Sequence, residues 1–399
     1  MEELNQTLDE VVRREKGRVV GRLVSQLGNL ETAEEAFQDA AVSALATWPK
    51  SGTPDNPGAW LTTSARNHAR DAFRRRKVSE KNAPLLREED AVDAESFESI
   101  SDDELRLIFT CCHPALTLES QVALTLKVVA GFSTEEIARG LLSPEPTIAQ
   151  RIVRAKRTIE EKQLPYAVPE GAELPERLGA VLAVIYLVFN EGHTSRQGPL
   201  MRLELQREAF RLSQVLCRLL PNESEVFGLF ALITFSLARA TTRTDEQGEL
   251  LLLSEQDRSK WDRSLIKEGL MALERARRLG AGSYAMQAEI SACHVTAPTW
   301  ERTDWARILR CYDALLELNP SPVVALNRAV ALGMHEGPRA ALSALTELET
   351  PLARYHHFYA VRADFRRRLG EDARHDYQRA LDLAGNESER RFLRKQMSI

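Results

Sequence analysis

Hydrophobic residues recur at three- and four-residue spacing along almost the whole chain, and few segments alternate apolar and polar positions with a period of two. The first spacing is typical of an amphipathic helix, and the second of a half-buried strand. Residues 8–48 and 59–77 both show the helical spacing, and a break rich in proline and glycine separates them at 49–58. The pattern therefore predicts an all-α protein.

Two further breaks divide the chain. The stretch from about residue 78 to 103 is polar and acidic, and three prolines and a glycine follow one another between residues 165 and 175. An acidic, apolar-poor stretch of this kind is typical of a flexible linker. We therefore expect a helical domain at 1–78, a linker at 79–100, a compact helical unit at 101–163 and a long helical region at 164–399.

The long region contains a repeat. Second helices of successive hairpins are expected to begin near Trp305, Pro338 and Asp372, at intervals of 33 and 34 residues. This is the period of tetratricopeptide repeats, in which each unit is a pair of helices. Earlier hairpins are expected at 204–239 and 261–295. The spacing predicts a tetratricopeptide-like helical-repeat domain.

The most specific motif lies at residues 131–157. Ser133 followed by Glu136 is a capping box that starts a short helix, and a second helix then buries Ile148, Ile152 and Ala155. In a helix-turn-helix, the second helix enters the major groove, where Gln and Arg side chains recognise adenine and guanine edges. The alternative is an ordinary helical hairpin with a solvated basic face. The outward candidates for DNA contact are Thr147, Gln150, Arg151, Arg154, Lys156 and Arg157.

A second basic helix is expected at 59–77. It carries six basic residues and one acid, Asp71, within a chain whose net charge is -5. Arg66, Arg70 and Arg74 recur every four residues and share one face. Aromatic and polar groups beside such a stripe suit single-stranded DNA, although for Trp60 taken alone a place in the core is favoured. The candidates here are Trp60, Thr62, Arg66, Asn67, Arg70, Asp71 and Arg74.

These two basic modules, in this order and joined by an acidic linker, resemble bacterial sigma factors of the extracytoplasmic-function group in the sigma-70 family. Residues 32–48 resemble region 2.2, residues 59–77 regions 2.3 and 2.4, and residues 131–157 region 4.2. The resemblance implies contacts with the β′ and β subunits of RNA polymerase core, with the double-stranded -35 element and with the melted -10 element. It implies a specificity subunit without a catalytic site or cofactor. The implied core-polymerase contacts are Glu35, Phe37, Gln38 and Asp39, although Phe37 could equally be a core residue.

The strings at 186–193, 288–294 and 319–329 resemble the C-terminal extension of one subgroup of these sigma factors, which carries a fused tetratricopeptide-like domain. The resemblance implies that the extension modulates activity in place of a membrane anti-sigma factor. It also implies a small YCII-related protein as a possible partner of the C-terminal domain.

A few side chains suggest a metal site, an acid–base site or a thiol switch instead. Glu191, His193 and His294 suggest a metal or acid–base site, but no HExxH or CxxC spacing accompanies them. Adjacent Cys111 and Cys112 suggest a thiol switch. Two alternative functions follow: a helical hydrolase built around Glu191 and His193, and a helical-repeat scaffold whose basic helices bind nucleic acid nonspecifically.

The composition bears on the number of cores and on the cellular location of the protein. The hydrophobic share of 43% predicts more than one core, and no apolar run approaches the roughly 18 residues of a membrane span. Five cysteines are few and odd in number, and the acidic N-terminus lacks the features of a signal peptide. We therefore expect a cytoplasmic protein without membrane attachment. The net charge of -5 argues against coating of nucleic acid by bulk charge, but it averages two basic faces against acidic segments.

Overall fold

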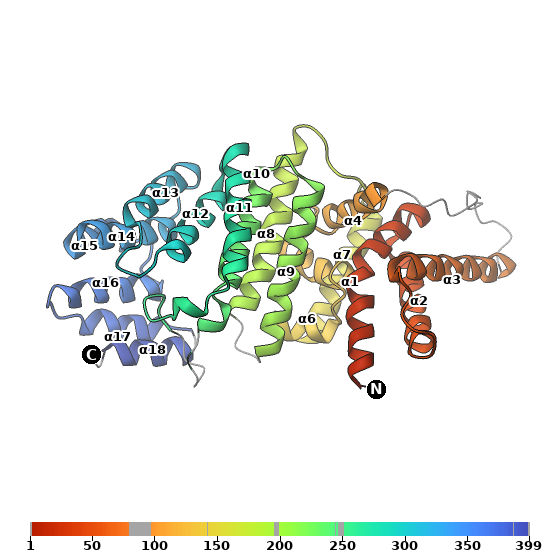
Figure 1. Ribbon diagram of the computed structural model, residues 1–399, viewed down its shortest axis with the longest axis horizontal. Coiled ribbons are helices and arrows are strands. Elements are labelled where there is room, and N and C mark those ends of the chain that lie inside the picture. The colour runs from red at the N-terminus through yellow and green to blue at the C-terminus, as the bar shows by residue number, and fades with distance from the viewer. Residues whose placement is uncertain are drawn as a thin grey trace. The chain divides into compact units, whose positions relative to one another are not determined.

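The computed structural model describes the backbone of residues 2–79, 97–141, 143–194, 199–243, 245, 251–385 and 387–397. Side chains are described over the same residues except at 2–10, 72–79, 97–102, 191–194, 199–202 and 387–389. Regular structure within these ranges is helical and contains no strand (Figure 1). The prediction of an all-α fold is confirmed.

The chain forms two compact units, Met1–Pro221 and Asn222–Ile399, which we call unit 1 and unit 2. The sequence predicted a domain boundary between residues 163 and 164, whereas the compact units divide after residue 221. The difference arises because helices α8 (Glu173–Thr194) and α9 (Pro199–Leu219) pack on the helices that precede them.

Unit 1 begins with α1 (Glu2–Leu27), α2 (Leu30–Ser51) and α3 (Pro57–Ser79), which pack on one another. The Asn29 side chain starts α2 by accepting a hydrogen bond from the Thr32 amide at 2.9 Å, because an N-cap oxygen satisfies an amide that lacks a helical partner. The small side chains that α2 buries allow its neighbours to approach closely. The proline- and glycine-rich break falls between α2 and α3, as predicted.

Four helices follow: α4 (Phe97–Cys111), α5 (Leu118–Val128), α6 (Thr134–Gly140) and α7 (Glu145–Glu161). The predicted capping box is present at α6. The Ser133 hydroxyl accepts from the Glu136 amide at 3.1 Å, and the Glu136 carboxylate accepts from the Ser133 amide at 2.6 Å. Because α6 and α7 pack on each other and α5 packs on α7, this segment forms the expected helix-turn-helix.

The α8–α9 hairpin completes unit 1. Arg177 Nη2 donates to the Phe109 carbonyl oxygen at 3.0 Å, near the end of α4, and Arg211 Nη1 lies 3.4 Å from Glu104 Oε1. A Cβ atom at Gly140 of α6 would lie 3.1 Å from the Leu205 side chain of α9. Residues 164–221 therefore belong structurally with the helix-turn-helix rather than with the rest of the C-terminal region.

Unit 2 is an array of helices that pack on neighbours one or two places away in the sequence (Figure 1). Helices α13, α15 and α17 begin within two residues of the expected starts Trp305, Pro338 and Asp372. Three 3-10 helices, Ala240–Thr242, Arg258–Lys260 and Thr346–Leu348, are also described. The α-helices are α10 (Ser224–Leu237), α11 (Arg263–Leu279), α12 (Ser283–Thr296), α13 (Trp305–Leu318), α14 (Pro322–Glu336), α15 (Pro338–Leu345), α16 (His356–Arg368), α17 (Arg374–Leu383) and α18 (Glu387–Met397).

One helical stretch, Ser224–Thr242, is long and apolar enough to span a membrane by length and composition, which the sequence analysis did not expect. Of its most apolar window, 61% is buried inside the protein. Helices α11 and α12 both pack on α10. We therefore assign this stretch as the central core helix of its unit.

Candidate nucleic-acid interface

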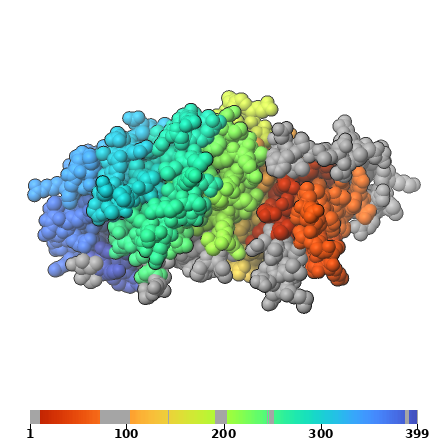
Figure 2. Space-filling view, viewed as in Figure 1, coloured from red at the N-terminus to blue at the C-terminus, as the bar shows by residue number. Residues whose placement is uncertain are grey.

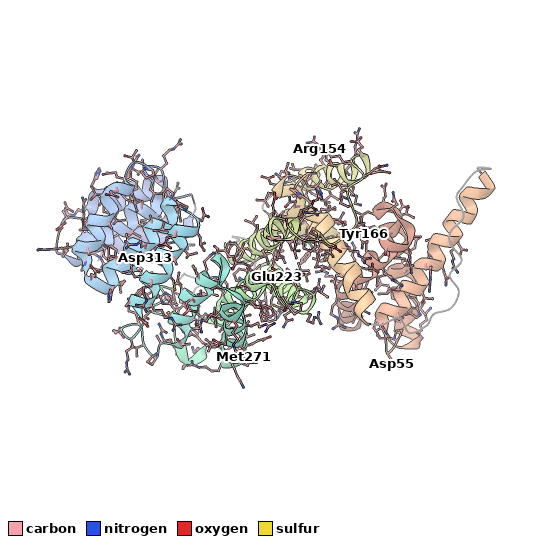
Figure 3. All side chains as sticks on the ribbon, turned by 90° about the horizontal axis from the view of Figure 1, so that it is seen from above. Asp55, Arg154, Tyr166, Glu223, Met271 and Asp313 are labelled. Carbon is pink, nitrogen blue, oxygen red and sulfur yellow. The ribbon has the colours of Figure 1, made fainter. Side chains whose placement is uncertain are left out.

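Helix α7 has one buried stripe and one exposed face, as predicted. Ile148, Ile152 and Ala155 are at most 5% exposed. Pro146 lies in the first turn, where its missing N–H group leaves no hydrogen bond unmade. Arg154 points away from the body of unit 1 in Figure 3. Of the other predicted contacts, Gln150 and Arg157 are exposed, and Thr147 and Arg151 are half-buried.

Val153, which was not among the predicted DNA contacts, is 63% exposed on the same face as Gln150 and Arg154. An apolar side chain in the groove can contact the methyl group of thymine. The signal was present in the sequence, because Val153 stands off the buried stripe of an otherwise polar helix face. We therefore add Val153 to the outward face of α7.

Lys156 was predicted to face outward as a DNA contact, but its side chain pairs with Glu34. Its Nζ lies 2.6 Å from Glu34 Oε2 of α2, so this side chain is engaged inside unit 1 and is not part of the open basic face. Arg157 stays outward and pairs with Glu161 one turn along at 2.6 Å. The sequence could show the charge of Lys156 but not its partner, which is more than a hundred residues away.

Glu34 is buried, at 3% exposed, between two lysines. Lys16 of α1 lies 3.5 Å from one carboxylate oxygen, and Lys156 lies 2.6 Å from the other. Burial lowers the pKa of Lys16 to about 8, although the Glu34 charge acts in the opposite direction. A buried carboxylate between two cations is therefore shared by the first helices of the chain and the helix-turn-helix.

Three further contacts join the same two parts of unit 1. Arg13 Nη2 lies 2.6 Å from the Glu136 carboxylate that caps α6. Arg22 Nη1 lies 3.2 Å from Asp103, and Lys16 donates to the Lys127 carbonyl oxygen at 2.7 Å. Burial raises the pKa of the Glu136 carboxyl, but its hydrogen bonds with Ser133 and Arg13 outweigh burial and lower it overall.

The backbone of α1 also approaches the backbone at Val129 and Asp103 closely, at two glycines. A Cβ atom at Gly17 would lie 2.9 Å from the Val129 carbonyl oxygen, and one at Gly21 would lie 2.7 Å from the Asp103 carbonyl oxygen. The Tyr166 hydroxyl, inside unit 1 in Figure 3, lies 2.7 Å from the Gly21 carbonyl oxygen and 2.8 Å from that of Asp103. One hydroxyl proton is thus shared between the two backbones at their closest approach.

Helix α3 presents the second predicted face. Trp60 is half-buried and packs edge-on against Trp48, with ring centroids 5.3 Å apart, so its ring is partly a core group. Asn67, Arg70 and Asp71 are exposed. Thr62 and Arg66 are half-buried. The Arg74 side chain lies outside the described residues. The exposed residues lie next to a tryptophan that keeps part of its ring at the surface.

Helix α2 carries the predicted polymerase contacts, and its surface (orange) is uncovered in Figure 2. Glu35, Gln38 and Asp39 are exposed, whereas Phe37 is 4% exposed and lies beneath the Lys16 ammonium. Phe37 is therefore placed in the core, which was the alternative that the sequence left open. Val42 and Leu45, at 67% and 40% exposed, follow at helical spacing and were missed by the sequence analysis. Together these residues form a mixed polar and apolar face.

The structure gives little support to the metal site and the thiol switch that the sequence suggested. Among the described residues, no group of three or more His, Cys, Asp and Glu side chains could hold a metal ion. Cys111 and Cys112 are buried, and burial raises the pKa of both thiols, that of Cys112 to about 12. Thiols of this kind are unreactive at neutral pH. The side chains of Glu191 and His193 lie outside the described residues.

Comparison with known proteins identifies three segments. Residues 11–78 match the model of sigma-70 region 2, and residues 106–159 match that of sigma-70 region 4. Residues 177–277 match a family of unknown function, DUF6596. This last match extends across the division between unit 1 and unit 2 at residue 221.

The chain is 41% identical over 391 residues to an uncharacterized protein of Rhizobium meliloti, a match that covers 95% of this chain and 92% of that protein. It is 31% identical over 119 residues to the ECF RNA polymerase sigma-E factors of Escherichia coli and Salmonella typhimurium. That match covers 27% of this chain and 60% of those factors.

Proposed function

We propose that the chain is a sigma-70-type initiation factor of the extracytoplasmic-function group, which directs RNA polymerase core to a specific set of promoters. Members of this family are DNA-binding initiation factors rather than enzymes, and they bind polymerase core and promoter DNA. Their work takes place in the cytoplasm. The polymerase performs nucleotidyl transfer, while the sigma factor positions it and stabilises unpaired DNA.

The observation that carries the proposal is the exposed face of α7. Gln150 and Arg154 have the donors and acceptors that match base edges in the major groove, and the capped α6 holds the helix in place. Arg151 and Arg157 add positive charge for phosphate contacts, which supply affinity and register. On this proposal α7 recognises the double-stranded -35 element.

Helix α3 is proposed to capture the -10 element after melting. Arg70 and the half-buried Arg66 lie where a displaced strand would follow the helix, and the half-buried Trp60 offers an aromatic ring for stacking with a base. Glu35, Gln38 and Asp39, extended by Val42 and Leu45, are proposed to contact polymerase core. Phe37 supports this face from below rather than touching the partner.

We also propose that the free chain is closed and opens on polymerase. The two promoter elements are about 25 base pairs apart, which at about 3.4 Å per base pair is about 85 Å. In the free chain, however, Lys156 of the reading helix and Glu34 of α2 are only 2.6 Å apart. The helix-turn-helix and the first three helices must therefore separate before both elements are bound, and Lys156 then becomes available for phosphate.

A finer proposal concerns the C-terminal region. The resemblance to one sigma-factor subgroup implies that a tetratricopeptide-like domain modulates activity and has a small YCII-related protein as a possible partner. The spacing of helix starts in unit 2 supports a repeat architecture, and the α8–α9 hairpin packs on the helix-turn-helix. Modulation would then act through this hairpin on the position of α7.

Reconstituted transcription with purified core polymerase and the full chain tests the main proposal. We expect specific initiation at a subset of promoters in a genomic library. Gln150→Ala is expected to weaken -35 discrimination by about ten- to hundredfold, because one bidentate base contact contributes about 1–3 kcal/mol. Arg157→Ala serves as the control, since it should lower affinity for all sequences alike and reduce the salt dependence. Nonspecific DNA binding without redirected initiation would instead support the scaffold alternative.

Fluorescence energy transfer between dyes at exposed Thr53 and Glu161 tests the closed state. Transfer should be high in the free chain and fall when core polymerase is added. The double substitution Arg13→Gln and Arg22→Gln should lower transfer without polymerase, because it removes two inter-segment ion pairs and leaves the outward face of α7 intact. Unchanged transfer in both experiments would show that the two parts do not separate.

A further inference from the structure

Unit 2 contains a cavity that the proposed function does not use. Its volume is about 170 Å³, and it lies where the end of α12, the loop after it, α13 and α14 meet. A dry cavity of about 150 Å³ in another protein holds one benzene molecule, so this space fits a single ring. Four of the lining side chains are aromatic or imidazole rings, namely His294, Trp300, Trp305 and Tyr312.

The rings of the cavity wall already support one another. His294 and Trp300 are stacked at 5.9 Å with an angle of 5° between their planes. Trp305 stands edge-on to both, with centroid distances of 5.3 Å to His294 and 4.9 Å to Trp300. A wall that is ordered before binding loses little side-chain freedom when a ligand enters.

Two arginines place positive charge beside this wall. Arg258 Nη1 donates to the carbonyl oxygens of His294 and Ala297, at 2.6 and 2.9 Å, and the guanidinium lies over the Trp261 ring. Arg239 is close enough to Arg258 and to His294 for its charge to act on both. Among the described residues, neither arginine has a carboxylate within ion-pair distance, although the charge of exposed Glu301 reaches Arg258.

Several polar atoms at this place lack partners. Arg239 Nε, Arg258 Nη2, His294 Nδ1 and Thr303 Oγ1 are buried without a hydrogen bond in the described structure. Such groups are rare in native proteins, and each calls for a water, an ion or a ligand. Burial and the two guanidinium charges lower the pKa of His294 to about 4, so its ring is neutral and the excess charge belongs to the arginines.

We propose that this cavity is a binding site for a small planar aromatic anion, such as a one-ring carboxylate. The ring would lie against Trp300 and Trp305, and the acidic group would face the side of Arg239 and Arg258. Rings of this kind also form cages for cations, but the two guanidiniums, which have no carboxylate within ion-pair distance among the described residues, oppose a cation here. The site would give the C-terminal region a small-molecule input, independent of whether the chain initiates transcription.

The test is a charge series on one ring, with the full chain and tryptophan fluorescence as the readout. Benzoate is expected to quench with a dissociation constant on the order of 1 mM, as suits so small a ligand. Benzamide should bind about tenfold more weakly and benzylammonium not measurably. Equal binding of all three, preference for benzylammonium, or no binding of benzoate would each overturn the proposal. Equal binding of inorganic phosphate would show that the ring is not recognised.

Two substitutions test recognition of the ligand's ring and of its negative charge separately. Trp300→Leu should abolish benzoate binding. Arg239→Gln should remove the preference for benzoate over benzamide while leaving the fold intact, because its buried Nε has no hydrogen-bond partner among the described residues. Arg310→Gln, at an exposed position of α13, is the matched control with the same change of charge. Loss of the preference in the control as well would show that only the overall charge matters.

Discussion

The two units are held together in different ways. In unit 1, polar side-chain contacts join residues far apart in sequence: Arg13 with Glu136 across 123 positions, Arg211 with Glu104 across 107, and Arg22 with Asp103 across 81. In unit 2 the ion pairs Arg362 with Asp376 and Arg328 with Asp313 join adjacent helices across 14 and 15 positions, and the contact of Glu225 with the Tyr284 amide spans 59.

The range of these contacts affects how each unit can rearrange. A unit whose helices are bonded to the next helix in the chain behaves as a one-dimensional array, whose stability is a sum of neighbour contacts. A unit whose segments are bonded over long distances can come apart at the joints while each segment keeps its helices. Unit 1 is therefore suited to rearrange on a partner, whereas unit 2 is suited to stay as a frame.

The largest effect is expected from removing the ion pairs that join α16 and α17 in unit 2. Asp376 is completely buried and accepts hydrogen bonds from Arg362 and Arg366 at 2.7–3.1 Å. Asp376→Ala leaves the half-buried Arg366 without this carboxylate and Arg362 with Glu349 alone, which costs about 3 kcal/mol, the lower end of the range for breaking a buried pair. Urea unfolding of the full chain should show an early transition for unit 2 alone. Asp364→Ala is the control, since its pairs with Arg367 and Arg368 are partly exposed and contribute less than about 1 kcal/mol.

Next in size is a pH response that has the same sign in the two units but falls in different pH windows. The pKa of Lys16 is lowered by burial from 10.5 to about 8, and that of His294, by burial and by the charges of Arg239 and Arg258, from 6.5 to about 4. Between each pair of values the folded chain holds fewer protons than the unfolded chain, so the free energy of unfolding rises with pH in that window.

Unit 1 should therefore gain stability as the pH rises from 8 to 10.5, and unit 2 should lose it as the pH falls from 6.5 to 4. Each change is at most about 3 kcal/mol. Urea midpoints compared with Lys16→Met and His294→Phe isolate the two groups. A wild-type curve parallel to that of the variant in the same window would contradict the corresponding prediction.

A smaller effect is expected from the joint between α1 and α4. Gly21→Ala places a methyl group 2.7 Å from the Asp103 carbonyl oxygen, and overpacking of this kind costs about 1–3 kcal/mol. We expect a more open unit 1 by small-angle X-ray scattering. Gly179→Ala on α8 meets nothing within 4 Å and should instead stabilise its helix by about 0.5–1 kcal/mol. If both variants scatter like the wild type, the α1–α4 contact does not control compaction.

The smallest predicted effect belongs to Val153. If its side chain covers a thymine methyl group, Val153→Ala should weaken -35 binding about fourfold, since one buried methyl group contributes about 0.8 kcal/mol. Replacing thymine by deoxyuridine in the -35 element should have a similar effect in the wild type and almost none in the variant. Additive losses from the two changes would place Val153 away from that methyl group.

Local features of the fold followed from the sequence. The capping box of Ser133 and Glu136, the buried stripe of Ile148, Ile152 and Ala155, and the helix starts near Trp305 and Pro338 were all predicted correctly. They depend on residues three or four positions apart, which the sequence displays directly. The candidate faces of α2, α3 and α7 followed for the same reason, because the side of a helix that a residue occupies is fixed by its position.

Other features needed the tertiary structure. Lys156 could not be assigned to Glu34 from the sequence, since nothing local distinguishes it from Arg157, which stays outward. Phe37 was undecided between surface and core, because either suits an apolar residue on an amphipathic helix. The boundary at residue 221 was also missed, because it depends on α8 and α9 packing against earlier helices rather than on the break at 165–175.

The sequence by itself determined which segments are helices and which faces they expose, and it predicted which of those faces bind DNA. Only the tertiary structure decided which charges meet, where the chain divides, and that the rings of Trp300, Trp305 and His294 line a cavity near Arg239 and Arg258. The physical reason is range. Helix formation and capping are settled by neighbours within one or two turns, whereas ion pairs, cavities and domain joints depend on residues that meet only after the helices have packed.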